Sequence, residues 1–152
     1  MNAGLVIYGS LEHVSGGYLY DRKLVEYLEG QGVAVEVLGL PYRSYARHLT
    51  DNFSYLLAEW LRAVDFDVLL QDELNHPSLW RLNERVCRSV DYPIVSIVHH
   101  LRSSEAHPGW LLGLYRRVER RYLRSVDAFI FNSETTRRTV EALAGEEKPH
   151  VV

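Results

Sequence analysis

The chain has 152 residues, 47% of them hydrophobic, and its 17 Lys and Arg residues nearly balance its 20 Asp and Glu residues. This length predicts one domain over residues 1–152, and the near-zero net charge argues against nucleic acid as a partner and gives no overall attraction to anionic membranes. The single cysteine, Cys87, excludes an intrachain disulfide and a thiolate metal cluster. A reducing compartment fits this composition, so a soluble chain in the cytoplasm is expected, without the ~18 consecutive apolar residues of a membrane-spanning helix.

The N-terminal stretch predicts a strand, a helix and a second strand. Residues 5–8 form a short apolar run that stops at a Gly-Ser pair, which is typical of a strand buried on both faces. Apolar residues recur at roughly helical spacing over 18–30, and residues 33–38 form a second apolar run. A right-handed crossover of this kind places the turn at Gly16 and Gly17 at the carboxyl edge of a parallel sheet, where ligands of such sheets bind.

The rest of the chain alternates between predicted helices and strands. Residues 41–52, which are rich in Tyr and Arg, are predicted to form an irregular loop that is either solvated or in contact with a ligand. The predicted strands cover residues 67–71, 93–98 and 127–131, with a sixth beginning in 148–152, and the predicted helices cover 53–64, 77–90, 109–125 and 134–143. This alternation favours an α/β fold: a Rossmann-like parallel sheet with helices on both faces.

Two common nucleotide-binding motifs are missing. The sequence has neither a Gly-x-Gly-x-x-Gly fingerprint after the first strand nor a Gly-x-x-x-x-Gly-Lys-Ser/Thr loop, so we expect neither a nicotinamide enzyme nor a phosphate-loop NTPase. The turn does contain Gly16 and Gly17 at a helix start, where free backbone amides and the positive end of the helix dipole can hold a phosphate. The alternative is that the two glycines only make a tight turn.

His99 is the second candidate site residue, because it follows the predicted strand 93–98. An imidazole there can donate a hydrogen bond to a ligand hydroxyl or phosphate and can titrate near neutrality, but a histidine at such a place can also be a satisfied polar group without function. A metal site made of His99, His100 and His107 lacks a carboxylate or thiol at standard ligand spacing. We therefore expect no metal, and no cofactor.

The predicted helix over 109–125 has the clearest sidedness in the chain. Leu111, Tyr115, Val118 and Tyr122 lie on one face. Five arginines lie mostly on the opposite face, at Arg116, Arg117, Arg120, Arg121 and Arg124. This pattern predicts either a core-packed helix with a solvated outer face or a basic strip from Arg116 to Arg124 that contacts anionic lipid or an acidic partner peripherally.

Three segments carry a resemblance to a known family. The first runs from Ser15-Gly16-Gly17 to Leu38, the second is the strand that ends in His99, and in the third, residues 122–136, a helix leads into a strand and a serine-capped helix. In this order, and over almost the whole chain, they resemble the N-terminal domain of a GT-B fold glycosyltransferase of family 4. This large family is retaining and uses nucleotide sugars, and its fold resembles metal-independent enzymes.

The resemblance implies the N-terminal half of a GT-B architecture, which mainly binds the acceptor. A C-terminal Rossmann-like domain with a Glu-x7-Glu motif would bind most of the nucleotide-sugar donor, and no two glutamates here have that spacing. This donor domain is expected in cis or as a separate chain. The resemblance thus implies the acceptor-side domain of a retaining glycosyltransferase, inactive when isolated, with sugar, nucleotide and acceptor undefined. The alternative is a freestanding nucleotide- or sugar-binding module that acts as a regulatory or assembly partner.

The resemblance also assigns roles to residues that match the family's motifs. Gly16 and Gly17 match its glycine loop, whose amides face the donor diphosphate. His99 matches its strand-end histidine and is the expected catalytic residue, in contact with the donor sugar or assisting the reaction. His100 stands where the family often has Asp.

Three polar residues follow the predicted strand 67–71 and are expected to contact the acceptor. They are Asp72, Glu73 and Asn75. Sugar hydroxyls need hydrogen-bonding partners at the carboxyl edge, which is the reason for this assignment. The alternative for these residues is a solvated loop.

Overall fold

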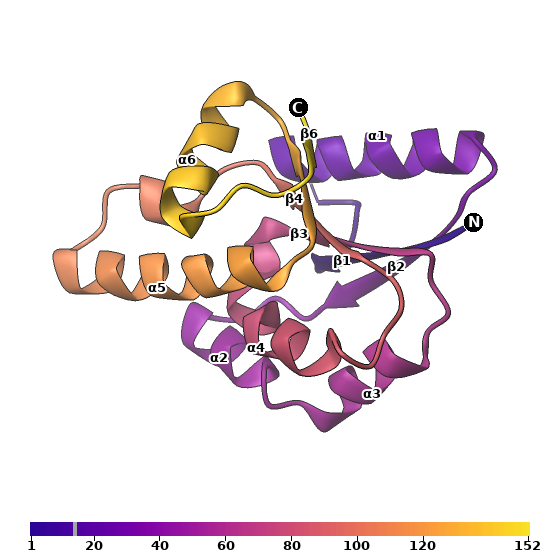
Figure 1. The fold of residues 1–152 in the computed structure, drawn as a ribbon, viewed down its shortest axis with the longest axis horizontal. Helices are drawn as coiled ribbons and strands as arrows, with labels where there is room; N and C mark the ends of the chain where they lie inside the picture. The colour runs from indigo at the N-terminus through magenta and orange to yellow at the C-terminus, as the bar shows by residue number, and fades with distance from the viewer. Residues whose placement is uncertain (14) are drawn as a thin grey trace.

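The computed structural model describes residues 1–13 and 15–152 and shows a parallel sheet of six strands flanked by helices (Figure 1). The strands are β1 (Asn2–Tyr8), β2 (Ala34–Leu40), β3 (Val68–Asp72), β4 (Ile94–Val98), β5 (Ala128–Phe131) and β6 (His150–Val151). The helices are α1 (Gly16–Gly30), α2 (Tyr45–Asp51), α3 (Tyr55–Ala63), α4 (His76–Val86), α5 (Gly109–Ser125) and α6 (Glu134–Ala144), with 3-10 turns η1 (Glu73–Asn75) and η2 (Arg102–Ser104). The predicted Rossmann-like α/β fold is confirmed.

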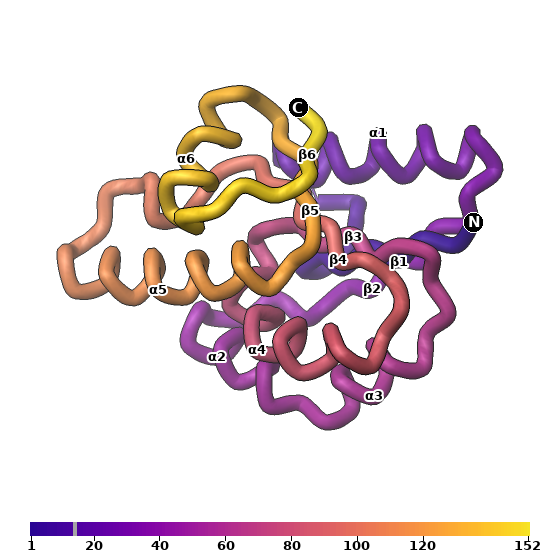
Figure 2. The backbone as a smooth tube through the Cα atoms, viewed as in Figure 1, coloured from indigo at the N-terminus to yellow at the C-terminus, as the bar shows by residue number. Residues whose placement is uncertain are grey.

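The strand order explains which helices cover which face. The order is β2-β1-β3-β4-β5-β6, and all neighbours are parallel. The step from β1 to β2 runs in the opposite direction to every later step, as the chain trace in Figure 2 allows the reader to follow. Because such crossovers are right-handed, α1 lies on one face, and Figure 1 shows α2, α3 and α4 on the other side of the strands. The direction reverses between β1 and β3, which makes this the topological switch point.

The core has two parts, one on each face of the sheet. In β1, Leu5 and Ile7 belong to the smaller cluster beneath α1, whereas Val6 and Tyr8 belong to the larger cluster, which includes residues of α3, α4, α5 and α6. Successive side chains of a strand point to opposite faces, so β1 contributes to both clusters. The continuously apolar run at residues 5–8 is therefore explained by burial on both faces, as predicted.

The prediction of an irregular loop over 41–52 is wrong, because α2 lies within it. This short helix depends on tertiary contacts more than on an apolar repeat. The ring of His48 is buried and stacks on Tyr8, with 3.9 Å between ring centroids, and Asn52 donates from Nδ2 to the Pro77 carbonyl at 2.6 Å. These contacts bring α2 to the carboxyl end of β1.

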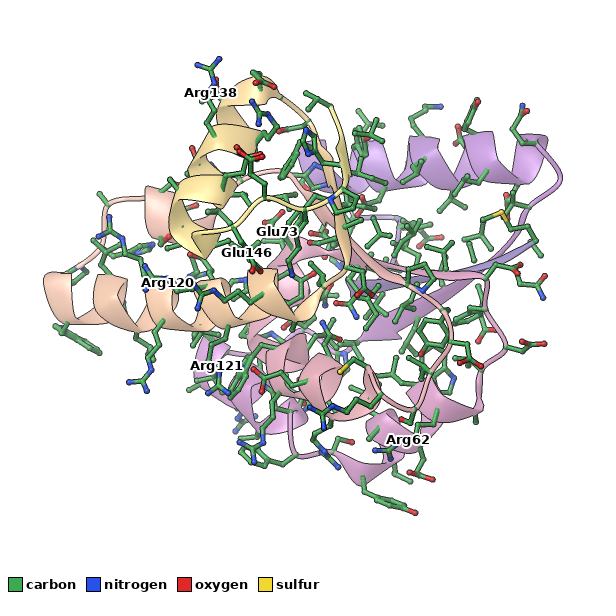
Figure 3. The ribbon with its side chains drawn as sticks, in the orientation of Figure 1. Arg62, Glu73, Arg120, Arg121, Arg138 and Glu146 are labelled. Carbon is green, nitrogen blue, oxygen red and sulfur yellow. The ribbon has the colours of Figure 1, made fainter. Side chains whose placement is uncertain are left out.

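Helix α5 has the predicted bounds, with Tyr115, Val118 and Tyr122 buried. Three of its exposed arginines bind other parts of the chain. Arg120 and Arg124 donate from Nε to the carbonyls of Leu143 and Ala144 in α6, and Arg121 pairs with Glu84 of α4 at 3.0 Å; Arg120 and Arg121 are labelled in Figure 3. The core-packed helix is thus present, and the peripheral membrane contact stays a prediction. Among the described helices, none is both long and apolar enough to span a bilayer.

Candidate functional site

A cavity of about 420 Å³ lies at the carboxyl edge of the sheet, beside the switch point. Its wall is formed by the end of β1, the start of α1, residues 42–48, η1 with the start of α4, and the segment that follows β4. Ligands of open α/β sheets bind in the crevice at this point. This cavity is therefore the candidate site.

The structure brings some of the sequence-predicted residues together at this cavity and leaves others behind its wall. Gly17, Glu73 and His99 line it, although they come from three separate parts of the chain. Gly16, Asp72 and Asn75 do not line it. His100 does, with its Nε2 at 3.8 Å from Glu105.

The start of α1 meets the ring of His99. Ser15 caps the helix, and its hydroxyl accepts a hydrogen bond from the Tyr18 N–H at 3.4 Å. A Cβ at position 17 would lie only 3.1 Å from Cδ2 of His99, so glycine there permits the close approach of ring and helix. The first turn of α1 contains no acidic residue, which leaves its amides and its positive dipole end suited to an anion.

His99 is fixed from its backbone and from its ring. Its N–H donates to Oε2 of Glu73 at 2.8 Å, and Asn132 donates from Nδ2 to its carbonyl at 3.0 Å. Its ring nitrogen Nε2 lies 3.3 Å from Oδ1 of Asp21, and Tyr20 packs edge-on against the ring. The backbone contacts hold His99 in place independently of its ring.

Asp72 at the end of β3 and Glu73 and Asn75 of η1 are buried, so the alternative of a solvated loop is wrong for them. Asp72 accepts a hydrogen bond from the Leu74 N–H at 2.9 Å. Asn75, with its amide nitrogen turned toward the sheet, reaches the Val6 carbonyl at 3.1 Å. Glu73, labelled in Figure 3, accepts from the backbone of His99. These buried side chains support the carboxyl edge of the sheet from within the protein. Contact with an acceptor remains a prediction, and of the three residues only Glu73 lines the cavity.

Asp21 was not among the predicted site residues, yet it is fully buried beside His99. It lies on α1 between Tyr18 and Val25, which are also buried, at spacings of three and four residues. The sequence did indicate this burial, because an acidic residue stands at helical spacing from residues on the face of the helix that packs against the core. Asp21 was missed because the helix was predicted from the spacing of its apolar residues. One of these, Leu19, is 54% exposed and so does not mark the buried face.

Asp21, Asp72 and His99 form a cluster behind the cavity. One ligand atom from each lies within 4.8 Å of the others, the only such group among the residues described, so these dimensions could also accommodate a cation. Burial and the neighbouring negative charge of Asp21 raise the pKa of Asp72 to about 7. Burial lowers the pKa of His99, but the hydrogen bond to Asp21 and the charges of Asp72 and Asp21 outweigh it, so this pKa is raised. The set differs from His99, His100 and His107, the one considered from the sequence.

A second set of hydrogen-bonded polar side chains also lines the cavity and was not predicted from the sequence. His76 is held neutral, because burial lowers its pKa to about 3. Its Nδ1–H donates to the Glu73 carbonyl at 2.9 Å, which leaves Nε2 to accept from the Tyr45 hydroxyl at 3.1 Å. Tyr45 and His48 lie in the stretch predicted as an irregular loop, and His76 falls between the predicted strand 67–71 and the predicted helix 77–90.

When the pH is raised from about 5 to about 8, the free energy of unfolding is expected to fall less in the Asp72→Asn variant than in the wild type. The pKa of Asp72 is raised from 3.8 to about 7, so in this range the folded chain holds a proton that the unfolded chain has released. The free energy of unfolding therefore falls as the pH rises, by about 3 kcal/mol from this group, and asparagine removes that contribution. Urea unfolding of both proteins across the range measures the difference.

Asp65→Asn is the matched control for this measurement, since Asp65 is exposed. Its stability curve should run parallel to that of the wild type. A parallel curve for Asp72→Asn would show instead that Asp72 is already ionised at about pH 5.

Comparison with known proteins identifies the family. Residues 21–152 match the sequence model of Glycosyltransferase Family 4. The matched range contains Asp21, Asp72 and His99, and Gly16 and Gly17 lie before it. No curated protein matches the chain. Because the match covers well over half of the sequence, the predicted resemblance is confirmed, and the chain belongs to Glycosyltransferase Family 4.

Proposed function

We propose that the chain is the acceptor-side domain of a retaining glycosyltransferase that moves a sugar from a nucleotide-sugar donor to an acceptor. The observation that carries this proposal is the meeting of Gly17 and His99 at one cavity on the switch point. Family membership supports glycosyl transfer, and the geometry suggests where the donor's diphosphate lies.

The start of α1 suits the charge that develops during transfer. In the reaction an acceptor hydroxyl oxygen forms a bond to the anomeric carbon as the bond between that carbon and a phosphate oxygen breaks. The electron pair of the broken bond leaves with the nucleoside diphosphate, which takes up the proton of the acceptor hydroxyl. Backbone N–H groups at Gly16 and Gly17, together with the positive end of the helix dipole, stabilise this charge without having to reorganise. The imidazole of His99 adds a donor at the same place.

The rest of the cavity suits an acceptor sugar. Tyr42 and Tyr45 give aromatic surface, and Ser44 and Arg43 give polar groups. An enclosure with a largely apolar lining and a few convergent polar groups is the usual form of a small-molecule site. We infer that the acceptor lies on this side and the donor on the Gly17 side.

A second Rossmann-like domain, in cis or as a separate chain, completes the donor site in this proposal. Most contacts to the nucleotide sugar then come from that domain. The chain of residues 1–152 by itself binds the nucleotide weakly and does not transfer sugar.

Isothermal titration of the chain with UDP, GDP and their common sugar conjugates tests the proposal, first alone and then with a donor-binding domain. Binding and sugar transfer are expected only when both parts are present. Gly17→Ala should weaken both, because its Cβ would press on the ring of His99, whereas Gly113→Ala, at an exposed position of α5 where a Cβ meets no atom within 4 Å, serves as the matched control. Tight nucleotide binding by the chain alone would contradict the acceptor-side assignment and favour a freestanding nucleotide- or sugar-binding module.

A further inference from the structure

The cluster of Asp21, Asp72 and His99 contains two buried carboxyl groups that have few hydrogen-bond or ion-pair partners. Both aspartates are fully buried, and each has an Oδ2 atom without a hydrogen-bond partner among the residues that the structure describes. A buried carboxylate is costly unless it is paired, protonated or hydrogen-bonded. Within the described parts of the chain neither aspartate pairs with Lys or Arg, so a proton and the charge of His99 are what balance them.

The two nitrogens of the His99 ring have different surroundings. Nε2 faces Oδ1 of Asp21 at 3.3 Å, on the buried side of the ring. Nothing in residues 1–13 or 15–152 hydrogen-bonds to Nδ1, and this atom is not sealed from solvent, since the ring lines the cavity. The close contact with position 17 and the edge of Tyr20 restrict the ring further. Nδ1 is therefore the nitrogen that a ligand can reach.

We propose that Asp21 is a positioning residue for His99: its carboxylate holds the imidazole by Nε2 in the charged form, so that Nδ1–H is presented to a ligand oxygen in the cavity. In this arrangement Asp72 carries the proton that allows two carboxyl groups to lie together. The identity of the ligand oxygen, in the sugar or diphosphate of the donor, rests on the proposed function. The Asp21–His99 arrangement itself does not.

The other groups that face His99 agree with this charge arrangement. Asp72 lies at the end of β3, and Glu73 of η1 accepts the His99 backbone N–H. Burial and the nearby Asp72 raise the pKa of Glu73 well above its ordinary value, which favours its neutral form. Asn132, on the β5 side, is uncharged and bonds to the His99 carbonyl. Asp21 is thus the carboxylate that contacts the ring.

Nitrogen-15 NMR of the His99 ring in the 152-residue chain tests the proposal without any need for enzymatic activity. The midpoint of the wild-type His99 titration is expected to lie above the ordinary value of histidine, about 6.5. In Asp21→Asn the midpoint of the His99 titration should move down by about 1 to 3 pH units, which is the usual effect of losing an opposite charge at this distance. His99→Gln identifies the signal.

Glu26→Gln is the matched control, because Glu26 is an exposed residue of the same helix that pairs with Lys23. The His99 midpoint should be unchanged in this variant. A wild-type midpoint at or below the ordinary value of histidine, about 6.5, or a midpoint that Asp21→Asn does not move, would overturn the proposal. The wild-type measurement decides the question if Asp21→Asn does not fold.

A metal ion is the competing explanation for the cluster, and Zn²⁺ and Mn²⁺ are the probes for it. Stoichiometric binding that shifts or broadens the His99 signals, and that Asp72→Asn abolishes, would overturn the proposal, because the nitrogen facing Asp21 would then hold metal in place of a proton. Unchanged signals would support the proton-based arrangement.

A kinetic measurement separates this inference from the proposed function. In the two-domain assay, Asp21→Asn should lower kcat by roughly 10- to 100-fold with a smaller change in KM, and should move the pH optimum downward. A purely structural loss would lower the amount of active protein and leave the pH profile in place. Absence of transfer by the wild type would count against the proposed function and leave the NMR result standing.

Discussion

His99→Ala is expected to lower the rate of sugar transfer by roughly 10²- to 10⁴-fold, the usual range for loss of a positioned proton donor or acceptor. The ring lines the cavity beside Gly17, where the departing diphosphate is proposed to lie. The measurement is kcat and KM in a protein that contains both the acceptor-side and the donor-binding domain. An effect concentrated on kcat is expected if the ring acts mainly in the transition state.

The backbone of His99 should keep its place in this variant, because Glu73 and Asn132 bind its N–H and carbonyl. Alanine does leave the buried Asp21 without its ring partner, so His99→Gln is needed beside it, since glutamine can donate to that carboxylate. His150→Ala, at an exposed position of the edge strand β6, is the control with expected wild-type turnover. Wild-type turnover in His99→Ala and His99→Gln would remove His99 from the active site.

The sequence predicted the central strands β1, β3 and β4 well because they are buried on both faces. Residues 5–8 form a continuous apolar run that stops at Gly9, and residues 93–98 are apolar except for Ser96 and end before His99. Carboxyl ends of parallel strands share one edge, so topology alone places His99 and the start of the first helix at the same edge of the sheet. The bounds of α5 were also predictable, since its buried face repeats with helical spacing.

The features that were not predicted depend on contacts between distant segments. Helix α2 has no apolar stripe, and it forms against Tyr8 and α4. The burial of Asp72 and Glu73 could not be predicted, because a run of acidic and polar residues after a strand usually indicates a solvated turn. Asp21 shows the same difficulty, since a single acid in an amphipathic helix most often lies on the exposed face. In each case a buried polar group is retained where the carboxyl edge forms the candidate site.

Gly39→Ala is expected to destabilise the fold by about 2 to 4 kcal/mol, because it forces side-chain volume against backbone. A Cβ at position 39 would lie 2.1 Å from the carbonyl oxygen of Gly9, far inside any real contact. That oxygen cannot rotate away, because Gly9 has a φ of +68° and its N–H donates to the Leu40 carbonyl at 2.8 Å. Urea unfolding measures the loss.

Gly30→Ala is the matched control, since a Cβ there meets nothing within 4 Å at the last residue of α1, and its stability should be equal or higher by about 0.4 to 1 kcal/mol. Gly39→Ala should also weaken ligand binding, because the strand end at Gly9 begins the connection from β1 to the start of α1 at the cavity. If the fold relaxes by moving this connection, the loss of stability will be smaller and the loss of binding larger. Equal stability and equal binding in both variants would contradict the close packing of β2 against the end of β1, on which the placement of Gly17 beside His99 depends.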